Sequence, residues 1–341
     1  MNKNIRYILT LLLFIPFLGS GQVVLSKEPT ALKAKGFRVV KVSDQRTNQA
    51  LKIQSPDGKQ QTAKALEHYL ATNLTQSKAG RPVVITLNEL SLTETPGAGG
   101  RLEGQLKIRL TFGLEKNYGV DPLTEYQGGL KFVRQKNSLL STESYIRSLL
   151  SASLTYFNNW LVNNENDNRK LATSVKVEFG DYTDRAEGDT IYYAANRPLT
   201  FADFRSKLRP PGNYAAFVIP GLVYDQDVKL VNGVLQVKLS FNAFLPKSAS
   251  WMHPSSRNAY TLNHEQRHFD IARIIANDFR RKIMAAKLTP DTFEGIINMQ
   301  YLDSLRDMHA MQKAYDDETR HGLDTGTQSI WNQRIDQDLK K

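Results

Sequence analysis

The spacing of apolar residues changes along the chain, and this change limits the possible fold more than any other feature. Up to about Phe241 the apolar residues mostly come in short runs with the alternation typical of β-strands. After Trp251 they recur at the i+3 and i+4 spacing of α-helices and continue so to the C-terminus. A chain of 341 residues is long enough for two domains of ordinary size. The pattern therefore predicts an α+β protein whose C-terminal part is a small β-sheet followed by helices.

Residues 23–162 are predicted to form a small α/β domain. Strand-like and helix-like segments alternate there, and the last of them, residues 141–162, has apolar residues at helical spacing. His68 is the single histidine of this region, and a lone histidine on a helix is usually structural. The sequence predicts no chemistry for this domain, and its role stays open.

A polar run at residues 163–169 contains no apolar anchor and is interpreted as the core of a linker over residues 163–172. Residues 173–341 are predicted to form the second domain. Its short strand signals lie at residues 175–179, 190–193, 214–219 and 234–241. Two or three helices are expected after them.

The N-terminus is typical of a secretory signal peptide at residues 1–21. Lys3 and Arg6 precede an apolar run at residues 7–18, and small residues follow up to Gly21. The run is too short for a comfortable membrane span, so no stable span is expected after cleavage. The chain contains no cysteine, which excludes disulfides, thiolate metal ligands and a lipidated cysteine. The predicted location is outside the cytoplasm, either periplasmic or secreted.

The charge balance is basic without pointing to one partner. Lys and Arg number 45 against 34 Asp and Glu, which gives a formal net charge of +11. The excess is spread along the chain and no nucleic-acid-binding motif is present, so nucleic acid is not an expected partner. Anionic polymers of the cell envelope and plain solubility are both compatible with this charge.

His264 and His268 are the strongest chemical signal in the chain. On an α-helix a separation of four residues places both imidazoles on one face, where they can bind the same Zn²⁺. Glu265 lies on the adjacent face, within reach of a metal-bound water, and is the predicted general base. Apolar residues continue the face of the two histidines, whereas Arg267 and Asp270 are expected on the solvent side. The pattern predicts a zinc site at the N-terminal end of a half-buried helix.

Two residues compete for the third ligand. A helix predicted from Thr289 and Pro290 onward carries an apolar stripe that reaches Tyr315, and Gly322 is a natural terminator. Glu318 continues the inward stripe, which favours it on geometry. His321 falls at the helix end, and its imidazole would complete a three-histidine site.

Several segments together resemble a bacterial family of predicted secreted zinc-dependent proteases of the zincin group, otherwise of unknown function. The resemblance covers roughly residues 175–341 and includes an extended motif in which Phe269 and Asp270 follow His264–His268. Its segments are residues 198–204, 250–251, 264–271, 315–322 and 328–331. It implies a zincin-like metalloprotease domain at residues 173–341. By position it implies His264 and His268 as ligands, Glu265 as base, and His321 or Glu318 as third ligand, with His321 first. Arg267 departs from the small residue expected inside the motif.

The predicted function is an exported zinc metalloprotease that acts on a protein or peptide substrate. Zinc activates a water molecule, and Glu265 passes the proton to the leaving amine. The alternative is a non-catalytic envelope binding protein with a structural or relic metal site. A structural site closes with a fourth protein ligand and needs no base, and the sequence offers no obvious fourth ligand.

Overall fold

The computed structural model describes residues 17–18, 21–27, 32–135, 142–180, 187–209 and 211–341. These residues form a mixed α+β fold, which confirms the fold class predicted from periodicity. They divide into two compact units between Glu165 and Asn166. Of the predicted signal peptide, only Phe17, Leu18 and Gly21 are described, so that prediction falls almost wholly outside the described residues. No helix of the described segments combines the length and apolar character needed to cross a membrane.

The first unit is built on a five-stranded sheet. Strands β7, β8 and β9 form an antiparallel meander, while β4 joins β7 in parallel and β1 joins it antiparallel. Two small parallel pairs, β2 with β5 and β3 with β6, complete the strands. The bounds are β1 Phe17–Leu18, β2 Gly21–Val24, β3 Leu32–Lys33, β4 Phe37–Asp44, β5 Leu51–Gln54, β6 Leu74–Thr75, β7 Arg81–Pro96, β8 Arg101–Lys116 and β9 Gly119–Gln135.

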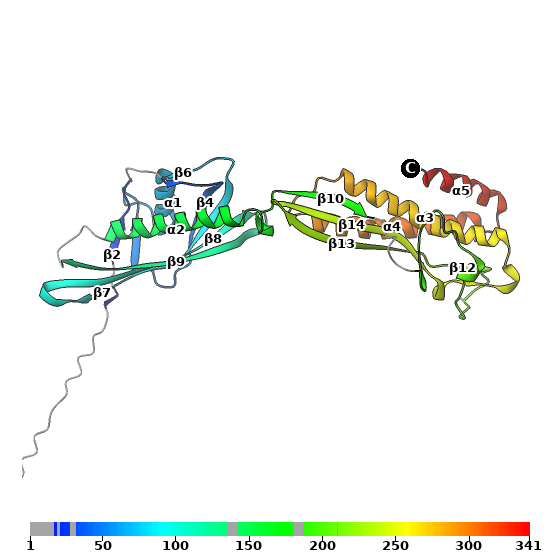
Figure 1. Ribbon diagram of the computed structural model, residues 1–341, viewed down its shortest axis with the longest axis horizontal. Coiled ribbons are helices and arrows are strands. Elements are labelled where there is room, and N and C mark those ends of the chain that lie inside the picture. Colours follow the sequence, from blue (N-terminus) through cyan, green and yellow to red (C-terminus); the bar gives the residue numbers. More distant parts are fainter. Residues whose placement is uncertain (1–16, 19–20, 28–31, 136–141, 181–186, 210) are drawn as a thin grey trace, which may run out of the picture. The chain divides into compact units, whose positions relative to one another are not determined.

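Two helices, α1 (Thr62–Asn73) and α2 (Thr142–Asn164), pack against these strands. Figure 1 shows α2 running along β8 and β9, which it contacts. The Phe112 ring of β8 stacks on the Phe157 ring of α2 with centroids 4.3 Å apart, and both side chains are fully buried. Stacked aromatic rings of this kind add to the free energy that burial itself supplies.

The second unit begins with a four-stranded sheet centred on β14. This strand pairs in parallel with β10 and antiparallel with β13 and β11. A separate antiparallel pair joins β12, which precedes β13 in the sequence, to β15, which follows β14. The bounds are β10 Ser174–Gly180, β11 Thr190–Tyr192, β12 Ala216–Phe217, β13 Gly221–Val231, β14 Val234–Pro246 and β15 Trp251–Met252.

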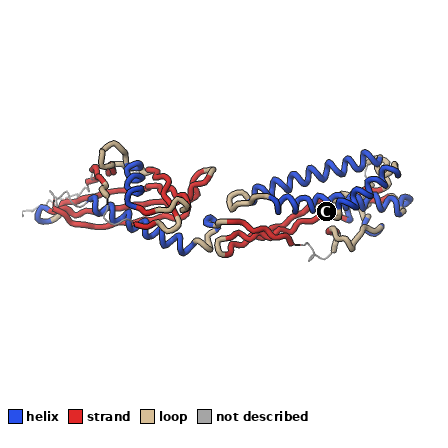
Figure 2. The backbone as a smooth tube through the Cα atoms, turned by 90° about the horizontal axis from the view of Figure 1, so that it is seen from above, coloured by secondary structure: helices blue, strands red, loops and turns tan. Residues whose placement is uncertain are grey.

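Three helices, α3 (Ala259–Ala285), α4 (Phe293–Thr319) and α5 (Thr325–Asp338), follow the sheet. Figures 1 and 2 show α3 and α4 running alongside the long strands β13 and β14. The apolar face of α3 packs on β14, where the Phe279 and Phe241 rings stack with centroids 3.9 Å apart. A smaller apolar cluster joins α3 to the other two helices through Tyr315, Trp331 and Ile335. These two clusters fix the position of α3, which carries the histidine motif.

Helix α4 and strand β12 have bounds that differ from the sequence-based expectation. Helix α4 begins at Phe293, about one turn after the predicted start, because the Thr289 carbonyl accepts hydrogen bonds from the Thr292 and Phe293 amides in a preceding turn. The strand expected at residues 214–219 is reduced to Ala216–Phe217, and Pro220, which lacks an amide hydrogen, follows shortly after it.

Candidate metal centre

The motif helix α3 begins with a side-chain cap. The Asn258 side chain accepts a hydrogen bond from the Thr261 amide at 2.9 Å, which satisfies one of the free amides of the first turn. One turn further on, His264, Glu265 and His268 are all buried, with 6%, 3% and 8% of their surface exposed. The helix therefore delivers the three predicted motif residues together to the interior.

Asp316, on α4, faces both histidines. Its Oδ1 atom lies 3.4 Å from His264 Nε2 and 3.1 Å from His268 Nε2. One nitrogen from each imidazole and one carboxylate oxygen all lie within 4.8 Å of one another. Among the described residues, these three side chains form the group that can hold a metal ion.

The geometry of this group fits a bound cation better than a hydrogen-bonded cluster. The buried Oδ1 atom of Asp316 has no hydrogen-bond partner among the described residues, although both imidazoles approach it. A tetrahedral Zn²⁺ with bonds of about 2.0–2.1 Å requires ligand atoms about 3.3 Å apart, close to the separations found here. Two imidazole nitrogens and one carboxylate oxygen are also a ligand set found in catalytic zinc sites. These residues therefore fit Zn²⁺.

The charge of Asp316 is maintained by its neighbours. Burial alone would raise the pKa of this carboxyl, but the two imidazoles outweigh burial and hold the pKa far below its usual range. The pKa of His268 is raised, because Asp316 and Glu265 together outweigh the burial that opposes protonation of the ring. An ionised carboxylate that faces two imidazole nitrogens is suited to bind a cation.

Glu265 is the buried carboxylate beside the two histidines. Burial raises its pKa from the usual value, while His268 and His264 oppose this rise. The backbone amide of Val218, just beyond β12, also contacts the carboxylate and favours its charged form. A carboxylate whose pKa is raised by burial is suited to accept and return a proton.

The two predicted third ligands have other surroundings. His321 follows the end of α4 in a left-handed backbone conformation with φ of 54°, and its Nδ1 lies 3.5 Å from Asp316 Oδ1. Its side chain is half exposed and contacts the Tyr214 ring. Glu318 turns away from the histidines and accepts a hydrogen bond from Trp331 Nε1 at 2.8 Å. His321 is thus next to the group, whereas Glu318 binds a core tryptophan.

Asp316 was not singled out from the sequence. The sequence does place Asp316 near the interior. It lies four residues after Gln312 and next to Tyr315, and so at the edge of the inward stripe of α4. The segment offers Asp317 and Glu318 as well, and the stripe, extended three residues beyond Tyr315, favours Glu318. The packing of α4 on α3 selects Asp316 instead.

The solvent side expected for α3 is largely covered. Asp270 is buried and accepts hydrogen bonds from Tyr193 Oη at 3.0 Å and Gln266 Nε2 at 2.8 Å. Arg267 is half-buried and forms ion pairs with Asp270 at 3.0 Å and with Asp336 of α5 at 2.6 Å. The expectation that Arg267 and Asp270 face solvent was wrong, because a loop and α5 pack over that side.

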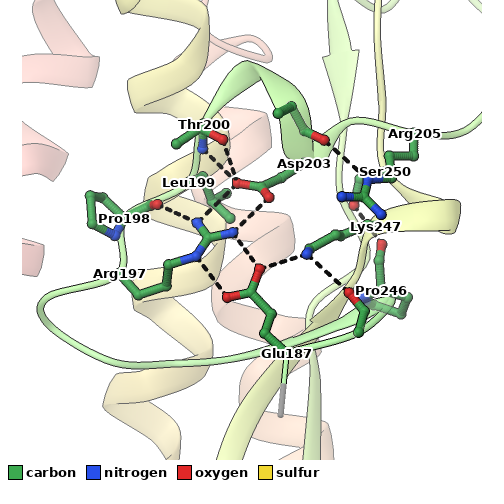
Figure 3. A network of polar contacts seen from close by, with 12 residues as sticks. Glu187, Arg197, Pro198, Leu199, Thr200, Asp203, Arg205, Pro246, Lys247 and Ser250 are labelled. Atoms are coloured by element: carbon green, nitrogen blue, oxygen red, sulfur yellow. Dashed lines mark hydrogen bonds and ion pairs between the residues drawn. The ribbon is translucent and has the colours of Figure 1, made fainter.

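That loop is held by a network of charged side chains (Figure 3). The Arg197 guanidinium bonds both Glu187 and Asp203, and Lys247 pairs with Glu187 at 2.5 Å. From this loop the Leu199 amide donates a hydrogen bond to the side-chain oxygen of Gln266, within the histidine motif, at 2.7 Å. The network thereby anchors the loop that contacts the motif helix.

Comparison with known proteins places this site inside a defined segment. A family described as a bacterial protein of unknown function (DUF922) matches residues 234–322, less than half of the chain. The matched segment runs from β14 to Gly322 and contains His264, Glu265, His268 and Asp316. This match agrees with the expectation of a family without an assigned function, and it adds no support for a protease.

No curated protein matches the chain at a significant level. Two of the solved structures with similarity are a minor lipoprotein from Acinetobacter baumannii and the rare lipoprotein B from Shewanella oneidensis. The first has 18% identity and a TM-score of 0.21, and it covers 37% of this chain and 94% of that one. The second has 10% identity and a TM-score of 0.19, and it covers 37% and 92%. TM-scores this low do not establish a shared fold.

Proposed function

We propose that the second unit is a zinc-dependent hydrolase of peptide bonds. His264, His268 and Asp316 are the proposed ligands, and Glu265 is the proposed general base. The observation that carries this proposal is the convergence of His264 Nε2, His268 Nε2 and the unpartnered Asp316 Oδ1 directly beside a buried glutamate. Three protein ligands and an adjacent base are the arrangement of a hydrolytic zinc site, which keeps one position for water.

Zinc in such a site polarises the substrate carbonyl and lowers the pKa of a bound water toward neutrality. Glu265 accepts a proton and returns it to the leaving amine. Its burial supports this role, because the raised pKa brings the carboxylate closer to the working pH. The Val218 amide holds the carboxylate from the side of β12.

Strand β12 supports a peptide as the substrate class. Among the described residues it pairs with β15 on one side, and no strand occupies its other edge. Phe217 and Ile219, beside the contact with Glu265, expose 38% and 50% of their surface. An open strand edge with exposed apolar side chains binds extended peptides by adding a strand.

The test is zinc content and hydrolysis of an unfolded protein substrate by the wild type and Glu265→Gln. We expect stoichiometric zinc in both proteins and a fall in hydrolysis of about 10²–10⁴-fold in the variant, the usual contribution of general acid–base catalysis. Both proteins are reloaded with zinc before the measurement, so that zinc lost during purification does not affect the result. A wild-type protein that binds no zinc after reloading contradicts the proposal.

A second candidate function is a non-catalytic envelope protein with a closed metal site. One observation favours it, namely that His321 Nδ1 lies 3.5 Å from Asp316 Oδ1 and offers a fourth ligand, which would be the third nitrogen. A site closed by four protein ligands has no position left for water.

His321→Ala separates the two candidates. For a hydrolase with three ligands we expect His321→Ala to bind zinc fully. Its zinc dissociation constant should change by less than about 10-fold, the smallest effect typical of mutating the hydrogen-bond partners of metal ligands. The measurement is competition with a chromophoric chelator. A loss of affinity above about 100-fold, together with no hydrolysis by wild-type protein, supports the closed site instead.

We further propose that the protein acts outside the cytoplasm after removal of residues 1–21. The basic start, the short apolar run and the small residues before Gln22 support this proposal. Cell fractionation followed by N-terminal sequencing of the mature chain tests it. A chain that keeps Met1 and stays in the cytoplasmic fraction contradicts export.

A further inference from the structure

Each histidine of the metal centre presents one ring nitrogen to Asp316 and the other to a glutamine. His264 Nδ1 lies 2.9 Å from the side-chain oxygen of Gln328, on α5. His268 Nδ1 forms a short contact with the side-chain oxygen of Gln312, on α4. The Nε2 atom of each ring faces Asp316. The two glutamines therefore stand directly behind the two proposed ligands.

The orientation of both amides is determined by their other hydrogen bonds. Gln312 Nε2 donates to the backbone carbonyl of His268 at 2.8 Å. Gln328, which is 1% exposed, donates from Nε2 to Tyr315 Oη at 2.5 Å and to Asn332 Oδ1 at 3.0 Å. Because both amide nitrogens are engaged in this way, the amide oxygens are what face the imidazoles.

An amide oxygen only accepts hydrogen bonds, so the facing Nδ1 atom must carry a hydrogen. A neutral ring with its hydrogen on Nδ1 has its lone pair on Nε2. The two amides thus direct the lone pairs of both rings toward Asp316, where the metal site lies.

We propose that Gln312 and Gln328 are positioning residues that hold His268 and His264 with their hydrogen on Nδ1 and Nε2 available to a metal. This inference rests on the proposed metal centre. Partners behind the ligands are more often carboxylates, carbonyls or water, and their removal typically weakens metal binding about 10–100-fold. Here both partners are neutral amides, so Asp316 is the one charged member among ligands and partners.

The assignment also gives α5 a part in the site. Gln328 lies six residues beyond Gly322, outside the segment that matches the family of unknown function. The family segment alone therefore holds both histidines but only one of their two partners.

The test uses the full chain with ¹⁵N-labelled histidine, free of metal, and detects hydrogens on Nδ1 by NMR. We expect Nδ1–H signals for both His264 and His268 in the wild type, assigned by comparison with His264→Ala and His268→Ala. Gln312→Leu should remove the signal of His268 only, and Gln328→Leu that of His264 only. The zinc dissociation constant should rise about 10–100-fold in each.

Two further variants keep the outcome interpretable. Gln312→Glu retains an acceptor and should restore the Nδ1–H signal of His268. Gln300→Leu, the same substitution on α4 away from the histidines, should change neither signal nor zinc affinity. A wild type without Nδ1–H signals overturns the assignment, as do leucine variants that leave both signals and the zinc affinity unchanged. A wild type with both signals that binds no zinc contradicts the proposed function alone.

Discussion

At the scale of single residues, the site depends on the contrast between Asp316 and its neighbour Asp317. Asp316 has its Oδ1 buried between the two histidines, whereas Asp317 is exposed and pairs with Lys313. The two residues are identical in chemistry and adjacent in sequence. The helix rotation of about 100° between them decides which one can be a ligand.

This contrast provides a matched pair of variants. Asp316→Asn removes the one charged ligand and should lower zinc affinity by more than about 100-fold. This is more than mutation of a ligand's hydrogen-bond partner usually costs. Asp317→Asn should leave the affinity unchanged, because its carboxylate does not face the site. Calorimetric or chelator titration of both variants measures the difference. Equal affinities would remove Asp316 from the ligand set.

The histidine motif itself could be read from the sequence. His264, Glu265 and His268 lie within two turns of one helix, so their mutual placement follows from helix geometry alone. The same reasoning does not select between His321 and Glu318 as the third ligand. His321 lies beyond the end of the helix, in a run of three consecutive residues at positive φ from Arg320 to Gly322. Helical spacing therefore no longer predicts the direction of its side chain.

At the scale of secondary-structure elements, the loop before η3 (Phe201–Asp203) shows how an ion-pair network supports the site. Glu187 bonds Arg197 and Lys247, and the same Arg197 bonds Asp203. Arg197 and then Lys247 lower the pKa of Glu187 from its ordinary value of 4.5 to about 2. The loop that contacts Gln266 is therefore held in part by an ionised Glu187.

The lowered pKa has a definite consequence for stability. The folded-state pKa of Glu187 is below its unfolded-state value, so its contribution is fully present above pH 4.5 and is lost as pH falls toward about 2. Because the Glu187 side chain is 38% exposed, we expect Glu187→Gln to cost at most about 1 kcal/mol at neutral pH. Denaturant unfolding of both proteins across this range measures it. A difference that persists unchanged at the acid end would exclude this origin.

Some elements could not be predicted from the sequence, and the reason is physical. Strand β13 (Gly221–Val231) pairs with β14 along its length, but its second half alternates half-buried with exposed positions and includes Asp225, Asp227 and Lys229. A strand with one open face and few fully buried side chains has a weak apolar signal. Buried strands such as β14 have a stronger apolar pattern, and a strand was predicted there.

At the scale of the whole molecule, the division between Glu165 and Asn166 separates the metal centre from the first unit. Every side chain of the proposed site belongs to the second unit, which has its own apolar cores. This unit should therefore hold the centre without the first.

We expect residues 166–341 expressed alone to unfold cooperatively and to bind zinc with the affinity of the full chain. Zinc at about 100 times its dissociation constant should stabilise this fragment by about 2.7 kcal/mol. The first unit, residues 22–165, serves as the control and should not respond to zinc. Calorimetry with and without zinc measures both. A fragment that folds but binds zinc far more weakly than the full chain would show that the first unit contributes to the centre.

The features that depend on short separations along the chain could be predicted from the amino-acid sequence. These are the change from strands to helices along the second domain, the α+β class and the placement of His264, Glu265 and His268 on one helix. The reason is that apolar periodicity and helix geometry act over a few residues.

The groups that complete the proposed site come together only through tertiary packing. The partners of the motif histidines, Gln312 and Gln328, are 44 and 64 residues away from them, and Asp316 also lies on a different helix. Their positions follow from how α4 and α5 pack on α3 through Tyr315 and Trp331. Such contacts depend on the fit of buried side chains between helices, which no local pattern in the sequence expresses.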